Sequence, residues 1–502
     1  MTDTALVYLG LFSLLYIGVL AAVIGGKARR HDGLAEFFVS GRDVGLGAAI
    51  ATLGATEIGL ITIAYNAQKG FNEGFAAFHI GLAALVGCAF IGLTGFVVKP
   101  LRRTGVYTIP EYYEQRYGRD VRVFGAVVMA LGGILNMGLF LKVASLFIAA
   151  MFSAKGIALN VNGLMVVLIA IAVAYTCYGG MRSVIVTDIF QFVLLAAGLL
   201  AAVAFLVRLV PVETAVEIVR EKKGAAGFDP IVNESFGLSY VAWMVFVAGI
   251  VSAAIWPTAL TRALCIEKEE TVPRAYLFAS VAFLSRMVIP AFLGILAFCY
   301  FSAAGPGPGS LLGSHGGDAD LVATALMFGH AMPDWLVAFL AVALFASFMS
   351  TQDGYLFCWA SILSRDVIGP VFGTVDNEWA QKLGTRSLIV LVALYELYWG
   401  LVYEGREDIW DYLAVSGSIY FCSGVVLLAG GLYWKGATRN GAILALILGF
   451  SAVLGLSPVK TAFGLEYLTA PAIGFLSIAL SVAGFVSGSI FSWQRTRAGG
   501  AS

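Results

Sequence analysis

The sequence predicts an all-α integral membrane protein with about 13 transmembrane helices, and three observations lead to this fold class. Of the 502 residues, 60% are hydrophobic and only 12% are charged, whereas a soluble globular domain is nearer half apolar and a quarter charged. The apolar residues gather in runs long enough to cross a bilayer. Because an open segment leaves its backbone groups unsatisfied in lipid, each run is expected to be a helix.

The expected spans follow one another along the whole chain, and we take residues 1–502 as a single transmembrane domain. The longest connections predicted on the outer side are 211–238, which could hold a short amphipathic helix, and 302–333. The thirteen expected spans cover residues 4–26, 43–68, 74–98, 121–153, 160–178, 183–210, 239–261, 275–301, 334–362, 384–403, 409–434, 441–459 and 468–492.

The lysines and arginines between the spans predict the orientation in the membrane. The connections that follow odd-numbered spans, together with the C-terminal tail, hold 21 of these residues, and the opposite side holds 8. Cytoplasmic loops carry the excess of positive charge. The N-terminus is therefore expected outside and the C-terminus in the cytoplasm.

The central ten spans divide into two halves of five helices, 43–210 and 239–434, with 4–26 and 441–492 as peripheral helices. An odd number of helices per half places the halves in opposite orientations, which is the inverted-repeat arrangement of many secondary transporters. Gly54 and Gly59 favour a break in the first span of one half, and Pro257 favours one in the other. Glycine and proline are also common in unbroken membrane helices, so the pattern leaves both options open.

Hydroxyl side chains in the ninth span could bind a sodium ion. Ser347, Ser350 and Thr351 lie within ALFASFMSTQDG, and a hard cation prefers oxygen ligands. Further oxygens have to come from backbone carbonyls of an unwound helix, and GATEIG at 54–59 is the candidate donor. The alternative is that these small residues only allow close helix packing.

Three of the charged residues inside apolar runs are candidates for function, because a charge there is costly. Glu57 could balance sodium, hold a substrate amine or pair with another group of the chain. Arg286 lies too deep for easy snorkelling and could bind a substrate carboxylate or form an internal ion pair. Asp188 could attract a departing cation, or it could cap a helix start at the interface.

Other classes of function find little support in the sequence. The six cysteines show neither disulfide nor metal-site spacing, and the four histidines lie far apart. The motifs GxxxxGK[ST], HExxH and GxSxG are absent, so we predict that the protein is not an enzyme and carries no cofactor. A net charge of zero and the lack of a basic stripe argue against nucleic acid as a partner.

Four segments resemble the sodium/solute symporter family, to which bacterial proline, sialic acid and sugar symporters belong. AYTCYGGMRSVIVTDIFQ at 174–191 looks like the family's signature, and TIPEYYEQRYG at 108–118 resembles its cytoplasmic loop motif. YWKGATRNGAILALILG at 433–449 resembles the pattern after the eleventh span, and FMST at 348–351 looks like the sodium-binding segment. The resemblance runs across nearly the whole chain.

The resemblance implies a LeuT-like fold with two inverted five-helix repeats and a sodium ion as the coupling ion. It implies that Ser350 and Thr351 bind sodium through their hydroxyls and Ser347 through its carbonyl. Asp188 would lie near the sodium exit. Ala55 and Ile58 would add carbonyl ligands from the broken second span.

The chain departs from the family's sugar transporters late in the seventh span. Trp256-Pro257-Thr258 replaces their polar Asn-Gln-aromatic run, and Thr261-Arg262 stands where relatives often have Gln-Arg. These departures weaken a sugar hypothesis and leave amino acids, carboxylates and other small polar solutes open.

We therefore predict a bacterial-type inner-membrane symporter that imports a small polar solute with sodium by alternating access, with the lipid bilayer as its surroundings. A transporter-like sensor, a channel or uniporter, and a proton-coupled symporter remain alternatives, and the pattern says nothing about oligomeric state. The candidate substrate contacts are Thr56, Glu57, Asn136, Trp256, Arg286, Ser416 and Tyr420.

Overall fold

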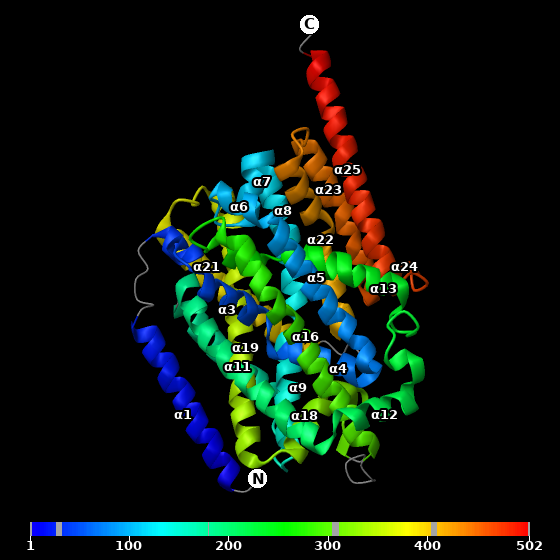
Figure 1. The fold of residues 1–502 in the computed structure, drawn as a ribbon. Helices are drawn as coiled ribbons and strands as arrows, with labels where there is room; N and C mark the ends of the chain where they lie inside the picture. Colours follow the sequence, from blue (N-terminus) through cyan, green and yellow to red (C-terminus); the bar gives the residue numbers. More distant parts are fainter. Residues whose placement is uncertain (1–2, 27–32, 179, 304–310, 403–408, 500–502) are drawn as a thin grey trace.

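The computed structural model describes residues 3–26, 33–178, 180–303, 311–402 and 409–499, and these form a bundle of helices (Figure 1). Within these ranges the only strand-like pairing is a single bridge between Val44 and Ile266. Gly179 of the signature segment and residue 403 of the expected span 384–403 lie outside the description. The first half of the chain forms α1 (Asp3–Gly26), α2 (Leu34–Val39), α3 (Leu46–Glu57), α4 (Leu60–Glu73), α5 (Phe78–Thr94), α6 (Val98–Thr104), α7 (Ile109–Tyr117), α8 (Arg119–Met137), α9 (Phe140–Ser153), α10 (Val161–Tyr178), α11 (Met181–Leu209) and α12 (Val212–Lys223).

The second half of the chain is also helical, with two π-helical segments at Met244–Val251 and Leu363–Ile368. Its helices are α13 (Gly237–Trp243), α14 (Ser252–Ile255), α15 (Pro257–Leu264), α16 (Thr271–Ala303), α18 (Ala319–Ala331), α19 (Asp334–Ile362), α20 (Gly369–Phe372), α21 (Glu378–Val402), α22 (Ile409–Tyr433), α23 (Arg439–Gly449), α24 (Ser457–Phe463) and α25 (Ala470–Gly499).

The helical fold confirms the predicted class, while the number of thirteen spans stays a prediction. In the described residues nine helices are long and apolar enough to cross a membrane, or ten if the bent pair Arg439–Gly455 and Ser457–Phe463 counts as one span. Each of the thirteen expected spans is mostly helical in its described residues. The amphipathic helix foreseen within 211–238 is α12.

The second and seventh expected spans are both broken, as Gly59 and Pro257 favoured. Between α3 and α4, Ile58 has φ −106° and ψ 69° and Gly59 has φ −86° and ψ 167°, so neither is helical. Gly54 lies inside α3 and marks no break. Trp256 is extended, with ψ 121°, and Pro257 begins α15. Proline suits the first position of a helix because its missing N–H has no partner there anyway.

The fourth expected span contains a milder interruption, which the sequence did not signal. Helix α8 ends at Met137 and α9 begins at Phe140, with a turn at Gly138 and Leu139 between them. Both turn residues stay close to helical geometry, so the chain keeps its direction across the membrane. Three interrupted helices therefore meet in the middle of the bundle.

Glycines allow α4 and α16 to cross with their backbones in contact. A Cβ on Gly294 would lie 1.9 Å from the carbonyl oxygen of Ala67, and a Cβ on Gly70 would lie 1.9 Å from that of Ala291. Real Cβ atoms do not approach so closely, because interiors are already packed at crystal-like density. This reciprocal contact fixes α4, the second half of the broken span, against α16.

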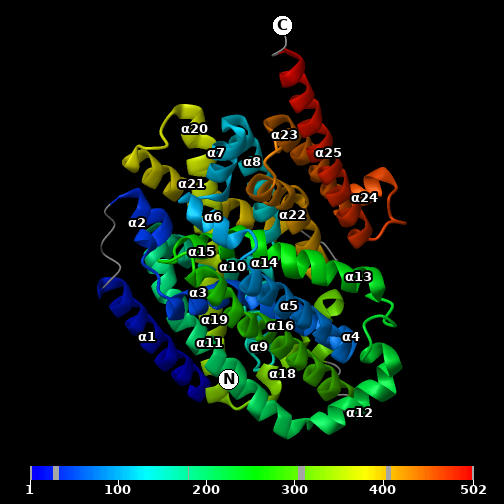
Figure 2. The ribbon, with the colours of Figure 1, turned by 45° about the horizontal axis from the view of Figure 1, so that its top comes forward.

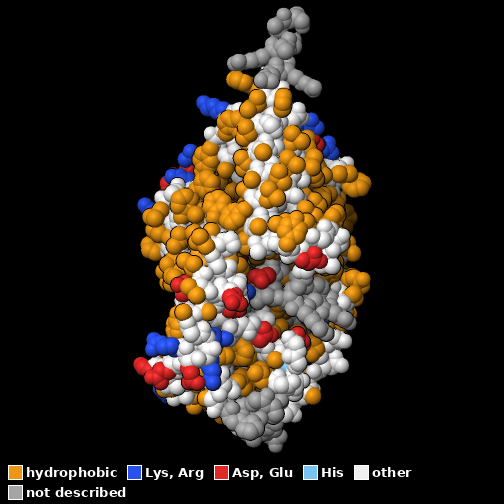
Figure 3. Space-filling view, turned by 90° about the vertical axis from the view of Figure 1, so that its right-hand side faces the viewer, with side chains coloured by type: hydrophobic (Ala, Val, Ile, Leu, Met, Phe, Trp, Pro, Cys, Tyr) orange, Lys and Arg blue, Asp and Glu red, His pale blue; other side chains and the backbone are white. Residues whose placement is uncertain are grey.

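The outer surface is widely hydrophobic, as expected for helices in lipid. Figure 3 shows hydrophobic side chains over much of the upper part of one face, with acidic side chains near its middle and a group of acidic and basic side chains toward its lower end. In Figures 1 and 2, α1 lies along the outside of the bundle and α25 extends beyond it at the opposite end. Helix α1 exposes Leu11, Leu14 and Leu15 by 59%, 71% and 64%.

We expect Gly294→Ala to destabilise the protein by about 1–3 kcal/mol, because the added methyl group overpacks the crossing of α4 and α16. The measurement is the melting temperature of the purified protein in detergent. Gly18→Ala is the matched control, since a Cβ on Gly18 in α1 meets nothing within 4 Å. Equal melting temperatures for the two variants would contradict the close approach.

Candidate functional site

The break between α3 and α4 lies directly against the hydroxyl-rich part of α19. The Ser347 hydroxyl donates to the carbonyl oxygen of Ile58 at 2.6 Å, and the Thr351 hydroxyl donates to the carbonyl oxygen of Thr56 at 3.3 Å. A Cβ on Gly59 would lie 2.4 Å from Oγ1 of Thr351. Only glycine therefore lets the broken segment come this close to α19.

The junction brings together the five residues expected to bind sodium. Each is buried, with exposures between 1% and 6%, and hydroxyl and carbonyl oxygens are the donors that a hard cation takes. The break supplies carbonyls because Ile58 and Gly59 leave the helical hydrogen-bond pattern. The donor set of the junction fits a sodium ion carried as a co-substrate. Its members are Ala55, Ile58, Ser347, Ser350 and Thr351.

Asp188 lies next to this junction and accepts hydrogen bonds from several hydroxyls. Ser350 donates to Oδ1 at 2.6 Å, and Thr52 and Thr56 donate to Oδ2 at 2.7 and 3.2 Å. Arg262 approaches Oδ2 at 3.4 Å, and both side chains of this ion pair are fully buried. Asp188 lies eight residues into α11, so it does not cap the start of that helix. Because the Ser350 hydroxyl donates its hydrogen bond to Asp188, the lone pairs of the Ser350 oxygen stay available to a cation.

The two charged residues of the second and eighth expected spans form an ion pair with each other. Nη1 of Arg286 lies 3.1 Å from Oε2 of Glu57 and 3.0 Å from the Glu57 carbonyl oxygen. The Thr258 hydroxyl donates to Oε1 of Glu57 at 2.6 Å, and the guanidinium lies 4.2 Å from the ring centre of Phe283. Internal pairing, one of the alternatives for both residues, is thus observed.

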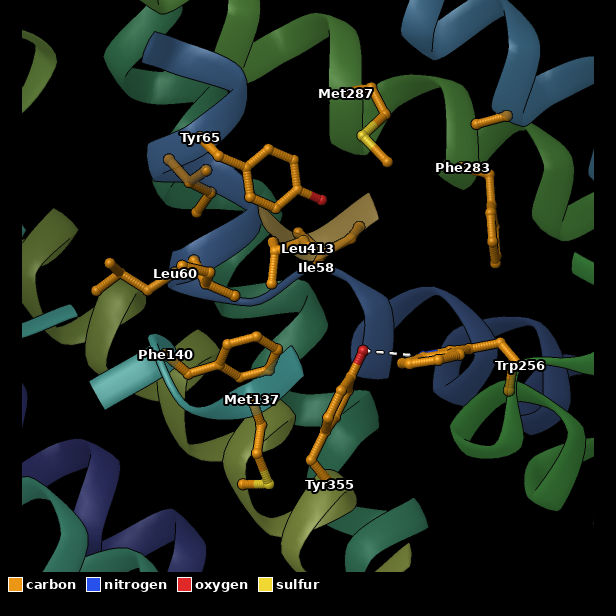
Figure 4. Packing of buried hydrophobic residues seen from close by; sticks show 14 of the residues in the cluster. Ile58, Leu60, Tyr65, Met137, Phe140, Trp256, Phe283, Met287, Tyr355 and Leu413 are labelled. Atoms are coloured by element: carbon orange, nitrogen blue, oxygen red, sulfur yellow. Dashed lines mark hydrogen bonds between the residues drawn. The ribbon is translucent and has the colours of Figure 1, made fainter. Parts of the chain in front are cut away.

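A cavity of about 100 Å³ lies beside this ion pair and next to the junction. Its wall is mainly aromatic, and Figure 4 shows Tyr65, Phe140, Trp256 and Tyr355 around the broken helix. Nε1 of Trp256 donates to the Tyr355 hydroxyl at 3.0 Å, which fixes both rings. Thr351 lines the cavity as well, so one residue contacts both the cavity and the oxygen cluster.

Most of the predicted substrate contacts line the cavity, and two do not. Ser416 and Tyr420 lie on the face of α22 toward Gly132 of α8, and the Ser416 hydroxyl accepts from Nδ2 of Asn136 at 3.1 Å. From α22 the cavity wall instead takes Gly417 and Phe421, one residue further along. The sequence placed both residues on α22, which does line the cavity, but it did not predict which face of α22 points toward the cavity. The predicted contacts in the wall are Thr56, Glu57, Asn136, Trp256 and Arg286.

Several residues of the site were not foreseen from the sequence. Arg262 was noticed beside the departure from the family pattern at Thr261, but its pairing with Asp188 was not expected. The sequence of an apolar membrane helix does not show whether its aromatic side chains face lipid, a neighbouring helix or a cavity. Of the aromatic wall residues named next, Tyr65 alone follows a predicted break closely, six residues after Gly59. The aromatic wall residues that sequence reasoning missed are Tyr65, Phe140, Trp243, Tyr355, Trp410 and Phe421.

The cavity continues toward the side that the lysine and arginine count places outside. A second cavity of about 210 Å³ shares Trp243 and Ala414 with the first and is lined by Tyr240 and Asp411. On the opposite side, a space of only about 10 Å³ lies between Pro257 and Phe357 and their neighbours. Of these three spaces, the largest lies toward the predicted outer side.

A buried ionic network closes the predicted cytoplasmic end. Arg122 lies 2.8 Å from Oδ1 of Asp366 and also contacts Glu114, and Arg365 lies 3.4 Å from Glu111. Thr108, the first residue of TIPEYYEQRYG, accepts from the Glu111 amide at 3.3 Å and donates to Asp366 at 2.9 Å. This segment thus caps α7 and ties it to the end of α19.

Comparison with known proteins gives consistent results over most of the chain. The family model described as "Sodium:solute symporter family" matches residues 37–449. The sodium/myo-inositol cotransporter of Canis lupus familiaris is 24% identical over 505 residues, which cover 92% of this chain and 67% of that protein. The sodium/proline symporter 2 of Staphylococcus saprophyticus is 22% identical over 461 residues, which cover 88% and 83%.

Among solved structures, the substrate-bound, outward-open state of a sodium-coupled sialic acid symporter superposes with a TM-score of 0.80 at 15% identity. The superposition covers 96% of this chain and 97% of that one. The fold is thus LeuT-like, and the protein is a multi-pass membrane protein. The family and its members support sodium-coupled symport rather than enzymatic catalysis. Because the family model matches most of its length, the chain belongs to the sodium:solute symporter family.

Proposed function

We propose that the protein is a sodium-coupled secondary active symporter that imports a small polar organic solute, such as an amino acid or another carboxylate, by alternating access. The observation that carries this proposal is the position of Thr351. Its hydroxyl belongs to the oxygen cluster at the broken helix, and its side chain also lines the charged cavity. The sodium ion and the solute would therefore both contact the part of the site that Thr351 forms.

Sodium would act by favouring one of two conformations. A ligand shifts such an equilibrium only through its differential affinity for the two states. An ion held between α3–α4 and α19 joins elements that have to separate if access alternates, so it favours the state in which they touch. For a solute of zero net charge, such as a zwitterion, one sodium ion moves one charge inward and gains about 2.3 kcal/mol per 100 mV of membrane potential, which corresponds to a solute gradient of roughly 40-fold.

The cavity suits a compact solute with a carboxylate and an apolar body. Nε of Arg286 is buried and has no hydrogen-bond partner among the described residues, and a guanidinium binds carboxylates through two parallel N–H groups. The Glu57–Arg286 pair has no net charge, so a solute anion entering with one sodium ion adds no net charge to the site. A zwitterion could place its ammonium toward Glu57. The aromatic wall would hold the remaining apolar part.

We also propose the setting in which this transport takes place. The protein would lie in a bacterial-type inner membrane with its N-terminus outside and its C-terminus in the cytoplasm, which the charge count supports. Residues 43–210 and 239–434 would form the two inverted repeats, each beginning with one of the broken helices. The larger outer cavity then corresponds to an outward-facing conformation, and Asp188 would lie on the sodium pathway.

The first test removes the proposed sodium hydroxyls. We expect Ser350→Ala combined with Thr351→Ala to raise the sodium concentration required for half-maximal thermal stabilisation by roughly 100-fold or more, since each of the two lost contacts to a charged group is worth about 1.5–3 kcal/mol. Sodium chloride is compared with choline chloride in purified protein. Ser361→Ala is the control, because its hydroxyl is buried on the same helix without a hydrogen-bond partner among the described residues. Unchanged sodium dependence would favour proton coupling or a sensor.

The second test addresses the solute. We expect Arg286→Lys to raise the KM of a carboxylate-bearing substrate by roughly tenfold or more. The lysine ammonium keeps the positive charge but lacks the two parallel N–H groups with which a guanidinium binds a carboxylate. Uptake into vesicles, with a panel of amino acids and monocarboxylates under a sodium gradient, identifies the substrate and gives the KM. Arg439→Lys is the control, since that arginine pairs with Asp120 at the exposed end of α23. An equal KM for wild type and Arg286→Lys would exclude this arginine as the carboxylate site.

A further inference from the structure

A fully buried carboxyl group on α21 links two parts of the site and has no place in the mechanism above. Glu396 is completely inaccessible to solvent. One of its oxygens accepts the backbone N–H of Leu141 at 3.1 Å, and the other accepts Nε2 of Gln352 in a short contact. Among the described residues, no lysine or arginine forms an ion pair with it.

The first contact reaches the interruption of the fourth expected span. Leu141 is the second residue of α9, directly after the turn at Gly138 and Leu139, where an amide has no carbonyl of its own helix to bond. The Glu396 oxygen takes over as acceptor. This interruption separates Asn136 from Phe140, and both line the cavity. Glu396 thus holds the cavity wall in its interrupted form.

The second contact reaches the helix that carries the sodium hydroxyls. Gln352 is fully buried and directly follows Thr351 on α19. Its bond to Glu396 fixes the rotation of α19 at the turn that presents Ser350 and Thr351 to the broken helix. The amide oxygen of Gln352 has no hydrogen-bond partner among the described residues, so the amide can turn over and accept a hydrogen bond from a donor at position 396.

We propose that Glu396 is a positioning residue that couples the sodium-binding face of α19 to the cavity wall at the α8–α9 interruption. An apolar side chain could fill the same volume but could not satisfy two buried donors, and each donor left unsatisfied costs about 1–3 kcal/mol. The carboxyl group makes both contacts through one rigid unit. A shift of α19 on binding sodium therefore reaches Asn136 and Phe140 without any direct contact between ion and solute.

The inference rests on the proposed function, and its test needs only sodium as the probe. Amide hydrogen exchange of the purified full-length protein is measured in sodium chloride and in choline chloride, because exchange reports local opening. In wild type we expect sodium to slow exchange both at 347–358 and at 136–143. In Glu396→Leu, exchange at 136–143 becomes the same in both salts, and the sodium requirement for stabilisation rises roughly 10- to 100-fold, as for other residues that orient metal ligands.

Two further variants separate positioning from a loss of folding. Glu396→Gln keeps an acceptor for Leu141 and can donate to the turned amide of Gln352, so it should retain the sodium effect at 136–143. Gln381→Leu, a buried substitution on the same helix that removes hydrogen bonds to Ser364 and Thr374, should lower stability and leave the sodium effect intact.

The possible results of the hydrogen-exchange experiment lead to different conclusions. Sodium-dependent protection at 136–143 that persists in Glu396→Leu, or loss of that protection in Gln381→Leu to the same degree, overturns the inference. If wild type shows protection at 347–358 and none at 136–143, the inference fails while the proposed sodium site stands. If sodium protects neither segment in wild type, the proposed sodium site itself fails.

Discussion

The structure depends on how an unwound backbone is kept inside a membrane. Where α3 stops and α4 begins, peptide groups lose their helical partners, and no water is available in lipid to replace them. The chain meets this constraint by pressing the break against α19, whose hydroxyls donate to the carbonyls of Thr56 and Ile58. Glycine at position 59 makes the contact possible, because any side chain there would collide with Thr351.

The same requirement governs the charges of the core. Asp188 pairs with Arg262, Glu57 with Arg286 and Asp366 with Arg122, each across elements far apart in the sequence. A buried pair of this kind does little for stability in itself, while removal of one partner leaves an expensive isolated charge. These pairs therefore specify which helices have to meet, and each pair by itself adds no net charge to the centre of the molecule. A cation that enters the site therefore interacts with the dipoles of hydroxyl and carbonyl groups in addition to any fixed negative charge.

Several features followed from the sequence because they depend on local composition. Apolar runs require helices in lipid, so the class of fold and the position of nearly every helix were predictable. Pro257 lacks the N–H that a continuous helix needs, and it begins α15 as expected. The hydroxyls of α19 and the donor segment at 54–59 were identified as partners through their chemistry and through the resemblance to a known family. Five of the seven candidate substrate contacts line the cavity.

The rest was decided by tertiary structure, because side-chain direction and pairing are not local properties. Ser416 and Gly417 differ by one position, about 100° around a helix, and only the packing of α22 against α8 determines which one faces the cavity. Glu57 and Arg286 each had several possible partners until the fold placed them 3.1 Å apart. Glu396 resembled any polar residue of an apolar span, since the amide that it satisfies belongs to an interruption that no residue type announces. The sequence by itself determined that the chain is a bundle of membrane helices with oxygen donors at its centre. The contacts between helices determined which donors converge, because burial in lipid forces each unsatisfied group to find its partner on another helix.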